Sequence, residues 1–228
     1  MIIMNDVYKT YQTGVTALNG VNIDIDKGEF VYIVGPSGAG KSTFIRLVYC
    51  EEIPTKGDIS IQGKITNKLK NREIPLLRRN VGVVFQDFKL LPRLTVYENV
   101  AFALEVIEEE PAVIRSRAME VLELVGLKNK VRSLPHELSG GEQQRVSIAR
   151  AIANDPDIVI ADEPTGNLDP DTSWSIMRIL EEINIRGTTV IMATHSKEIV
   201  NTIKKRVIAI ENGIIVRDEY QGDYGYEI

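Results

Sequence analysis

The chain has 228 residues, of which 43% are hydrophobic, so it can bury a core large enough for one domain or two small lobes. Its formal net charge of -5 at pH 7 provides no basic field, which argues against nucleic-acid binding through bulk charge. A single cysteine, Cys50, excludes an internal disulfide, and no signal peptide or apolar run of about 18 residues is found, so we expect a cytosolic protein that does not span a membrane.

Short apolar runs of strand type recur along the chain. They cover residues 30–34, 81–85, 158–161 and 189–193, and helical patterns lie between them, as in 41–49 and 174–185. Runs without alternation suit strands that are covered on both faces, and their alternation with helices is typical of a parallel sheet with crossover helices. Two further segments, 21–25 and 58–61, alternate apolar and polar residues and predict a smaller antiparallel side sheet.

The remaining segments complete the predicted fold. Helical patterns cover residues 96–106 and 111–125, with Gly126 as a terminator, and Asn212-Gly213 between two apolar runs predicts a type I′ hairpin over 207–216. The last ten residues have the composition of a polar tail. We predict a single α/β domain over residues 1–228: a mostly parallel P-loop sheet core (1–87 and 146–228), an antiparallel side sheet and a helical insert subdomain (88–145).

A glycine-rich stretch follows the first buried run and matches the pattern G-x-x-x-x-G-K-[ST] between a predicted strand and a predicted helix. Its backbone N–H groups can face the phosphates of a nucleoside triphosphate, Lys41 supplies a cation, and Ser42 is placed to ligate Mg²⁺. A glycine turn before an ordinary helix is the alternative interpretation. The predicted nucleotide-binding residues of this loop are Gly35, Pro36, Ser37, Gly38, Ala39, Gly40, Lys41, Ser42 and Thr43.

Polar residues follow three other predicted strands, at the sheet edge where ligands of open α/β folds bind. Asp162 is assigned to Mg²⁺, and Glu163 beyond it can accept a proton from an attacking water. Gln86 can orient that water and touch the metal, and His195 can contact the terminal phosphate. The alternative for Asp162 and Glu163 is a solvated acidic strand end, and the alternatives for Gln86 and His195 are surface or capping roles.

A second stretch suited to an anion is LSGGEQQR, residues 138–145. Ser139 and Glu142 form a predicted capping box, so a helix running through Arg150 starts here with its N–H groups and positive dipole end outward. Because the phosphate loop already encloses one nucleotide, this helix end is suited to a nucleotide held by another copy of the chain. An ordinary capped helix remains the alternative.

These motifs resemble, in their order along the chain, those of the ABC ATPases: GPSGAGKS, Gln86, LSGGEQQR, ADEP and His195. The resemblance implies ATP hydrolysis with Mg²⁺ in a homodimer that forms on ATP binding. It also implies that Ser139, Gly140 and Gly141 reach the terminal phosphate on the other copy, and that Asp169 couples the two sites. Tyr11, which from the residues alone has core packing as its default role, would stack on adenine.

Finer features resemble the FtsE family of bacterial cell-division ATPases: FQDFKLLP, EPTGNLDP and RVIAIENGIIVRDE. The resemblance implies an FtsX-like integral membrane partner and control of peptidoglycan hydrolases. ATPases of lipoprotein-release or macrolide-export systems, which share EPTGNLDP and the Leu-Leu-Pro turn, are the alternative. A second alternative is a nucleotide-gated scaffold that hydrolyses little ATP.

An apolar segment just after Gln86 is a candidate for the partner contact. The segment contains four large apolar residues, more than a solvated turn needs, so we predict a groove for a short helix of the membrane partner. Anchoring of the helical lobe is the alternative. The protein would then be peripheral at the cytoplasmic face of the cell membrane, with membrane contact only through the partner and no nucleic-acid partner. The predicted groove residues are Phe88, Leu90, Leu91 and Leu94.

Overall fold

The computed structural model describes residues 1–225, and the contacts within it divide the chain into two compact units. Unit 1 holds Met1–Arg78 together with the chain from Thr189 onward, and unit 2 holds Arg79–Thr188. This division by contacts does not test the predicted boundaries of the helical subdomain, which stay a prediction.

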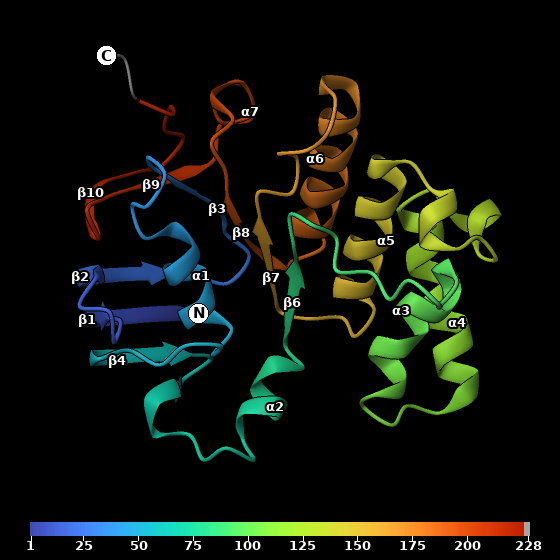
Figure 1. Ribbon diagram of the computed structural model, residues 1–228, viewed down its shortest axis with the longest axis horizontal. Coiled ribbons are helices and arrows are strands. Elements are labelled where there is room, and N and C mark those ends of the chain that lie inside the picture. The colour runs from blue at the N-terminus through green and yellow to red at the C-terminus, as the bar shows by residue number, and fades with distance from the viewer. Residues whose placement is uncertain (226–228) are drawn as a thin grey trace. The chain divides into compact units, whose positions relative to one another are not determined.

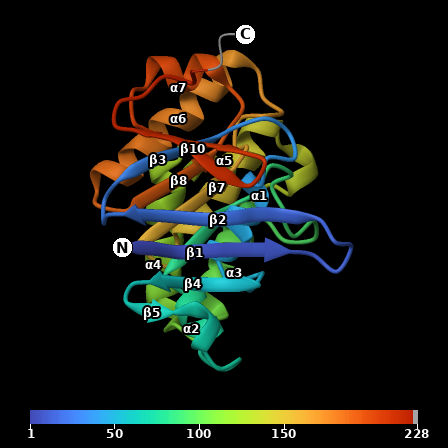
Figure 2. The same cartoon turned by 90° about the vertical axis from the view of Figure 1, so that its left-hand side faces the viewer.

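Unit 1 contains an antiparallel sheet in the order β2-β1-β4-β5 and the strands β10-β9-β3-β8 (Figures 1 and 2). In the second group β3 is parallel to β8 and β9, whereas β10 pairs antiparallel with β9. The strands are β1 (Ile2–Thr10), β2 (Thr16–Ile25), β3 (Phe30–Val34), β4 (Lys56–Ile61), β5 (Lys64–Ile65), β8 (Thr189–Ala193), β9 (Arg206–Glu211) and β10 (Ile214–Glu219). The helices are α1 (Lys41–Val48), the 3-10 turn η1 (Thr66–Lys68), α2 (Ile74–Arg78) and α7 (Lys197–Thr202).

The two kinds of strand in unit 1 follow the sequence patterns. Every residue of β3 and β8 is buried, as continuous apolar runs require, whereas β2 alternates buried and exposed positions in its second half. The inner strand β1 was expected only as a strand before Tyr11, and its bounds were not predicted. Its pairing with β2 shifts register between Met4 and Val7, and Asp6 in that interval has a φ of 48°, so this bulge interrupts the alternation that marks a strand.

The end of unit 1 contains one confirmed prediction and one that was wrong. Asn212 and Gly213, between β9 and β10, both have positive φ (49° and 78°), as a type I′ turn requires. The predicted polar tail is instead a docked segment up to residue 225. Tyr224 is buried, its N–H donates to Asn201 Oδ1 (2.7 Å), and its carbonyl accepts from Arg217 (2.8 Å). Residues 226–228 of that prediction lie outside the described residues.

Unit 2 combines a parallel strand pair with a group of helices (Figure 1). β6 pairs with β7, and α3, α4 and α5 contact one another. At Gly82 of β6 an added Cβ would lie 2.2 Å from the Ala151 carbonyl oxygen, so α5 lies directly against this strand. The strands are β6 (Val81–Val84) and β7 (Ile158–Asp162). The helices are α3 (Val96–Glu105), α4 (Pro111–Leu124), η2 (Lys128–Lys130), η3 (Pro135–Glu137), α5 (Gly140–Ile152) and α6 (Pro170–Ile185).

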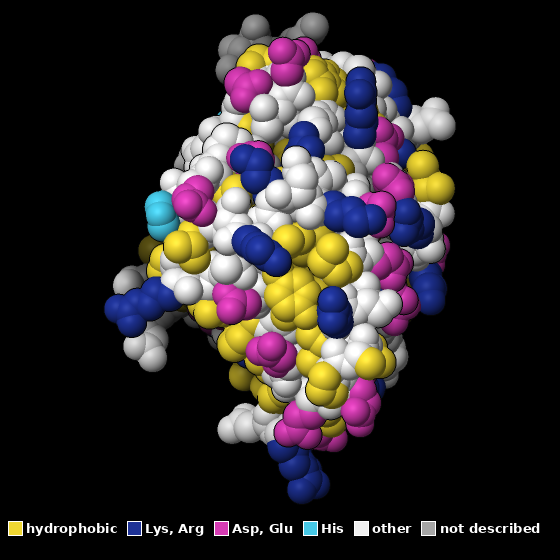
Figure 3. Space-filling view, turned by 90° about the vertical axis from the view of Figure 1, so that its right-hand side faces the viewer, with side chains coloured by type: hydrophobic (Ala, Val, Ile, Leu, Met, Phe, Trp, Pro, Cys, Tyr) yellow, Lys and Arg dark blue, Asp and Glu magenta, His cyan; other side chains and the backbone are white. Residues whose placement is uncertain are grey.

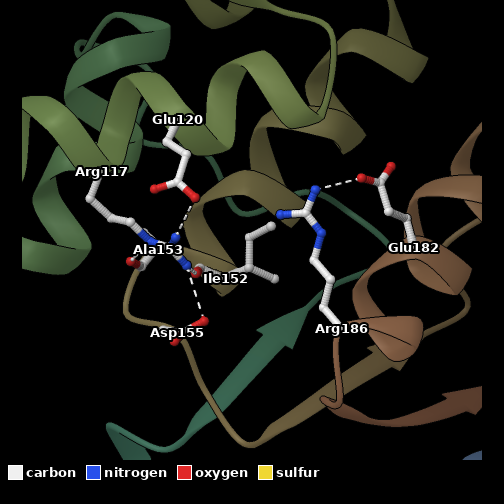
Figure 4. A network of polar contacts seen from close by, with 7 residues as sticks. All are labelled: Arg117, Glu120, Ile152, Ala153, Asp155, Glu182 and Arg186. Carbon is white, nitrogen blue, oxygen red and sulfur yellow. Dashed lines mark hydrogen bonds and ion pairs between the residues drawn. The ribbon is translucent and has the colours of Figure 1, made fainter.

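An arginine joins α4 to the end of α5 within this unit (Figure 4). Arg117 donates to the carbonyl oxygens of Ala153 (3.1 Å) and Ile152 (3.4 Å) and pairs with Asp155 (3.1 Å). The last carbonyl groups of a helix have no partner within the helix, so a guanidinium group stabilises this end. Among residues 1–225, no helix has both the length and the apolar character needed to cross a bilayer.

Candidate functional site

The predicted phosphate loop connects β3 to α1 in unit 1. An added Cβ would lie 2.1 Å from the Ile210 carbonyl oxygen at Gly35 and 2.4 Å from the Ala17 carbonyl oxygen at Gly40, so neither position tolerates a side chain. Gly40 also has a φ of 113° and is the N-cap of α1. With no capping side chain at Gly40, the first N–H groups of α1 are available to an anion.

Lys41 and Tyr11 lie at this loop. The Lys41 ammonium donates to the carbonyl oxygens of Gly35 (2.8 Å) and Pro36 (3.0 Å), so it lies over the loop. The Tyr11 hydroxyl is 3.2 Å from Thr43 Oγ1, and the Lys9 ammonium lies 5.3 Å from the Tyr11 ring centroid. Tyr11 is half-buried at the loop rather than in the core, which is compatible with the predicted contact to a bound base.

His195 lies at the same sheet edge as the phosphate loop. Strands β3 and β8 run parallel with Ile33 opposite Ala193, and the Thr194 N–H donates to the Ile33 carbonyl (3.2 Å). The phosphate loop follows β3 and His195 follows β8, and the His195 side chain is exposed. Unit 1 therefore presents a histidine and the predicted phosphate loop at adjacent strand ends.

Unit 2 brings Gln86 and Glu163 together around Gly166. An added Cβ at Gly166 would lie 3.2 Å from Gln86 Nε2 and 3.6 Å from Glu163 Cβ, and the Gly166 N–H donates to the Glu163 carbonyl (3.1 Å). Glu163, just beyond Asp162 at the end of β7, has a φ of 49°. A left-handed non-glycine residue is strained, and such strain is concentrated at functional sites. The Gln86 amide and Glu163 thus lie close to the same glycine.

The predicted capping box at Ser139 is confirmed. The Glu142 N–H donates to Ser139 Oγ (3.3 Å), and the Ser139 N–H donates to the Glu142 carboxylate (2.9 Å). This backbone donor, helped by Lys130, lowers the pKa of Glu142 below its ordinary value. Ser139 is exposed, and a cavity of about 480 Å³ lies beside it, with Gly141, Arg145 and Thr172 in its lining.

The two glycines of this helix start allow close contact with the segment after Glu163. An added Cβ at Gly141 would lie 2.3 Å from Thr172 Cγ2, and one at Gly140 would lie 3.5 Å from Leu168 Cδ2. Asp169 caps α6 by accepting from the Thr172 N–H (3.0 Å), and hydrogen bonding from Thr172 lowers the pKa of this exposed carboxylate. Asp169 and Ser139 therefore begin two helices, α6 and α5, whose first turns are in contact.

The predicted groove residues are all half-buried. An added Cβ at Gly140 would lie 3.9 Å from the Phe88 ring, so this ring lies at the start of α5. The buried Asn99 side chain of α3 accepts from the Leu91 N–H (2.8 Å) and donates to the carbonyl oxygens of Leu91 (3.1 Å) and Leu94 (2.9 Å). The segment is thus anchored to the helices through its backbone, which leaves its side chains partly exposed.

Three residues of this region were not predicted. Gln144 and Arg150 of α5 and Asn99 of α3 hold loops through hydrogen bonds to backbone carbonyl groups. Gln144 and Asn99 are fully buried polar residues on helices with apolar faces. A polar residue on such a face is the signal that could have identified them.

A phosphate loop, an acidic strand end with its amide, and a glycine helix start define a P-loop ATP-binding cassette. Residues 18–166 match the model of the ABC transporter family. The chain therefore belongs to the ABC transporter family, and it is an ATPase with the α/β fold of that cassette.

Relatives cover the full length of the chain. It is 70% identical to the cell division ATP-binding protein FtsE of Bacillus subtilis over 225 residues, which are 99% of each chain. It is 63% identical to the Streptococcus pneumoniae protein of the same name over 227 residues, covering 100% of this chain and 99% of that one. A solved dimeric structure of the ATP-binding cassette MJ0796, in a post-hydrolysis state with ADP and Pi, has a TM-score of 0.87 at 40% identity and covers 97% of this chain and 99% of its own.

Proposed function

We propose that the chain is the ATP-hydrolysing subunit of an ABC complex that works in bacterial cell division. The observation that carries this proposal is 70% identity over 99% of the chain to a protein named FtsE. The presence of the phosphate loop, the acid pair and the glycine helix start in one chain supports hydrolysis rather than nucleotide binding alone.

ATP would be held first by the phosphate loop. The N–H groups at the start of α1 and the Lys41 ammonium bind the phosphates, and Tyr11 stacks on the base. The present bonds from Lys41 to the carbonyl oxygens of Gly35 and Pro36 place its ammonium where it can exchange those partners for a phosphate oxygen. Phosphate oxygens accept hydrogen bonds, so their ligands must be donors such as the Lys41 ammonium, and a carboxylate could not replace it.

The donor set fits Mg²⁺. Ser42, Gln86 and Asp162 offer a hydroxyl, an amide and a carboxylate oxygen, which are hard ligands of the kind that Mg²⁺ prefers. No cluster of three or more His, Cys, Asp or Glu side chains that could hold a metal occurs among residues 1–225. One carboxylate is enough for an ion that is also bound by nucleotide phosphates. When bound, the ion neutralises charge on the phosphates.

Hydrolysis would then depend on the residues that follow the strands. Glu163 accepts a proton from the attacking water, Gln86 orients that water, and His195 donates a hydrogen bond to the terminal phosphate. The cluster of Gln86 and Glu163 around Gly166 supports a common role for the two side chains. General-base catalysis of this kind contributes about 10²–10⁴-fold in rate.

Two copies would bind ATP head to tail. The exposed Ser139 and the N–H groups of Gly140 and Gly141 would bind the terminal phosphate of the nucleotide on the other copy, and Asp169 would couple the two sites. The capped start of α5 and the dimeric state of the MJ0796 cassette support this arrangement.

The membrane partner would be an FtsX-like protein, and the complex would regulate peptidoglycan hydrolysis. A short helix of that partner would lie against Phe88, Leu90, Leu91 and Leu94, which are half-buried and follow Gln86 directly. The chain would then be peripheral at the cytoplasmic face of the membrane and attached only through the partner.

The Glu163→Gln variant tests the catalytic part of this proposal. It keeps the shape of the side chain and removes the base, so we expect ATP binding to persist while hydrolysis falls at least a hundredfold. With Mg-ATP the variant should accumulate as a dimer, which light scattering detects. Glu105→Gln, which changes an exposed carboxylate on α3, is the control and should keep wild-type turnover. Wild-type turnover by Glu163→Gln would show that another group is the base.

A further inference from the structure

Arg150, near the end of α5, donates to two consecutive carbonyl groups just after Gln86. Its Nη1 lies 2.6 Å from the Lys89 carbonyl oxygen and its Nη2 lies 2.9 Å from the Phe88 carbonyl oxygen. The guanidinium is half-buried, and its burial lowers the pKa of Arg150 from the ordinary value. Partial burial of a cation carries a desolvation cost, which the two carbonyl contacts offset in part.

The two carbonyl groups belong to strained residues. Phe88 has a φ of 61° and Lys89 a φ of 48°, so two non-glycine residues in succession adopt the left-handed conformation. Such a pair directs its carbonyl groups to the same side. A guanidinium offers two donors in a fixed planar fork, which matches two neighbouring acceptors, whereas an ammonium offers a single point of contact.

The strained pair lies between Gln86 and the anchored part of the segment. Beyond it, Asn99 fixes the backbone of Leu91 and Leu94. Before it, Gln86 follows β6 with an exposed side chain, and its carbonyl oxygen accepts a long hydrogen bond from the Asn167 side chain (3.5 Å). The strained residues 88 and 89 are therefore the link between Gln86 and the part of the segment that Asn99 anchors.

We infer that Arg150 is a positioning residue for Gln86: by holding the carbonyl groups of Phe88 and Lys89 it keeps the Gln86 amide beside Glu163. This inference rests on the proposed role of Gln86 at the metal and the water. It has a mechanical consequence, because Arg150 and Ser139 lie on the same helix. A displacement of α5 that follows contact of Ser139 with a phosphate would move the loop that carries Gln86 as well.

Two substitutions of Arg150 test the inference, with Arg117 as a matched control. Arg150→Met removes both donors and keeps the length of the side chain, and Arg150→Lys keeps the charge without the fork. Arg117 also donates to two backbone carbonyl groups of unit 2, at Ile152 and Ala153, so Arg117→Met removes a comparable pair of carbonyl contacts that does not involve residues 88 and 89 (Figure 4).

The readouts separate positioning from stability. We expect Arg150→Met to lower kcat about tenfold, equivalent to about 1.4 kcal/mol, and to raise the half-saturating Mg²⁺ concentration several-fold. ATP binding in EDTA, followed with a fluorescent ATP analogue, should stay at the wild-type level. Arg150→Lys should also lower kcat and raise the half-saturating Mg²⁺ concentration, by smaller factors than Arg150→Met. Arg117→Met should lower the thermal midpoint without changing the Mg²⁺ requirement.

The Gln86→Ala variant and the double variant complete the test. If Arg150 acts through Gln86, Gln86→Ala alone raises the Mg²⁺ requirement and adding Arg150→Met changes it no further. If the two single increases in the half-saturating Mg²⁺ concentration multiply in the double variant, the inference is overturned. It is also overturned if Arg150→Met has the wild-type Mg²⁺ requirement while Gln86→Ala has an altered one. No change in Gln86→Ala would overturn the proposed role of Gln86 and the inference with it. Should Arg150→Met fail to fold, Arg150→Lys carries the same comparison.

Discussion

The side-chain amide of Gln144 donates a hydrogen bond to the carbonyl oxygen of Pro164, 2.8 Å away. Both residues are buried, Gln144 completely, and Pro164 is the residue after Glu163. Gln144 lies in the second turn of α5, beyond the capping box of Ser139. This single bond therefore connects the helix that presents Ser139 to the strained turn that presents Glu163.

The first prediction concerns this bond. Gln144→Leu leaves the Pro164 carbonyl buried without its donor, so we expect a loss of about 1–3 kcal/mol in the free energy of unfolding. Because Glu163 is next to Pro164, kcat should fall as well. Urea unfolding and steady-state ATPase assays measure the two effects. A variant with wild-type stability and turnover would contradict the role assigned to the bond.

Ser147 provides the matched control for Gln144. It lies one turn further along α5, it is equally buried, and its hydroxyl has no hydrogen-bond partner among residues 1–225. Removing a buried polar group that makes no bond relieves a desolvation cost, so Ser147→Ala should be neutral or slightly stabilising and should keep full ATPase activity.

The parts that could be predicted from sequence are those set by local patterns. The buried run at Phe30–Val34, the capping box at Ser139 and the turn at Asn212 each depend on a few neighbouring residues, and the structure has all three. The helix from Val96 and the helix from Pro111 end within one residue of the predicted limits for the same reason.

Contacts between distant residues could not be predicted in this way. Arg150 and Lys89 are far apart in the chain, and no spacing rule connects an arginine near the end of a helix to a loop carbonyl. Tyr224 was assigned to a polar tail because its neighbours are polar, yet it is buried with its N–H on Asn201. The bounds of strand β1 could not be predicted, because a bulge at Asp6 breaks its alternation.

The second prediction is a pH dependence at the start of α5. The folded pKa of Glu142 lies below its unfolded value of about 4.3. The ionised carboxylate therefore stabilises the folded state fully above that pH, and this contribution to the free energy of unfolding is lost as the pH falls through the folded pKa. The difference in unfolding free energy between wild type and Glu142→Gln should therefore narrow on going from about pH 6 to about pH 3. Urea unfolding at several pH values measures it, and a constant or widening difference contradicts it.

The third prediction tests the partner groove. Phe88→Asp and Leu91→Asp should lose co-purification with the FtsX-like membrane protein, since a charge in an apolar contact is costly to desolvate. Both variants must first be shown to fold and to bind ATP, because the Phe88 ring also lies at Gly140 and the Leu91 backbone is held by Asn99. Retained partner binding in both folded variants would show that the partner does not bind at this groove.

Two controls locate the partner contact on unit 2. Ile185 of α6 is 82% exposed, and Ile185→Asp should leave the complex intact. Hydrophobic side chains also gather on the face shown in Figure 3, and the exposed large apolar residues of α3 and α4 include Phe102 and Val113. Loss of the partner in Phe102→Asp, with retention in Leu91→Asp, would move the contact from the groove to this helical face.

The last prediction tests the head-to-tail dimer. Lys41→Ala removes the cation of the phosphate loop, and Ser139→Arg places a bulky cation at the capped start of α5, so each homodimer should be inactive. In a heterodimer the two defects fall in the same composite site, and the other site has an intact Lys41 from one copy and an intact Ser139 from the other. Random mixing makes about half of the dimers heterodimers with one working site each, so ATPase activity should recover to at most about a quarter of the wild-type level. Two different affinity tags allow the heterodimer to be purified and its turnover measured directly. If each copy instead completed its own site from its own Lys41 and Ser139, both sites of the heterodimer would be defective and it would stay as inactive as its parents.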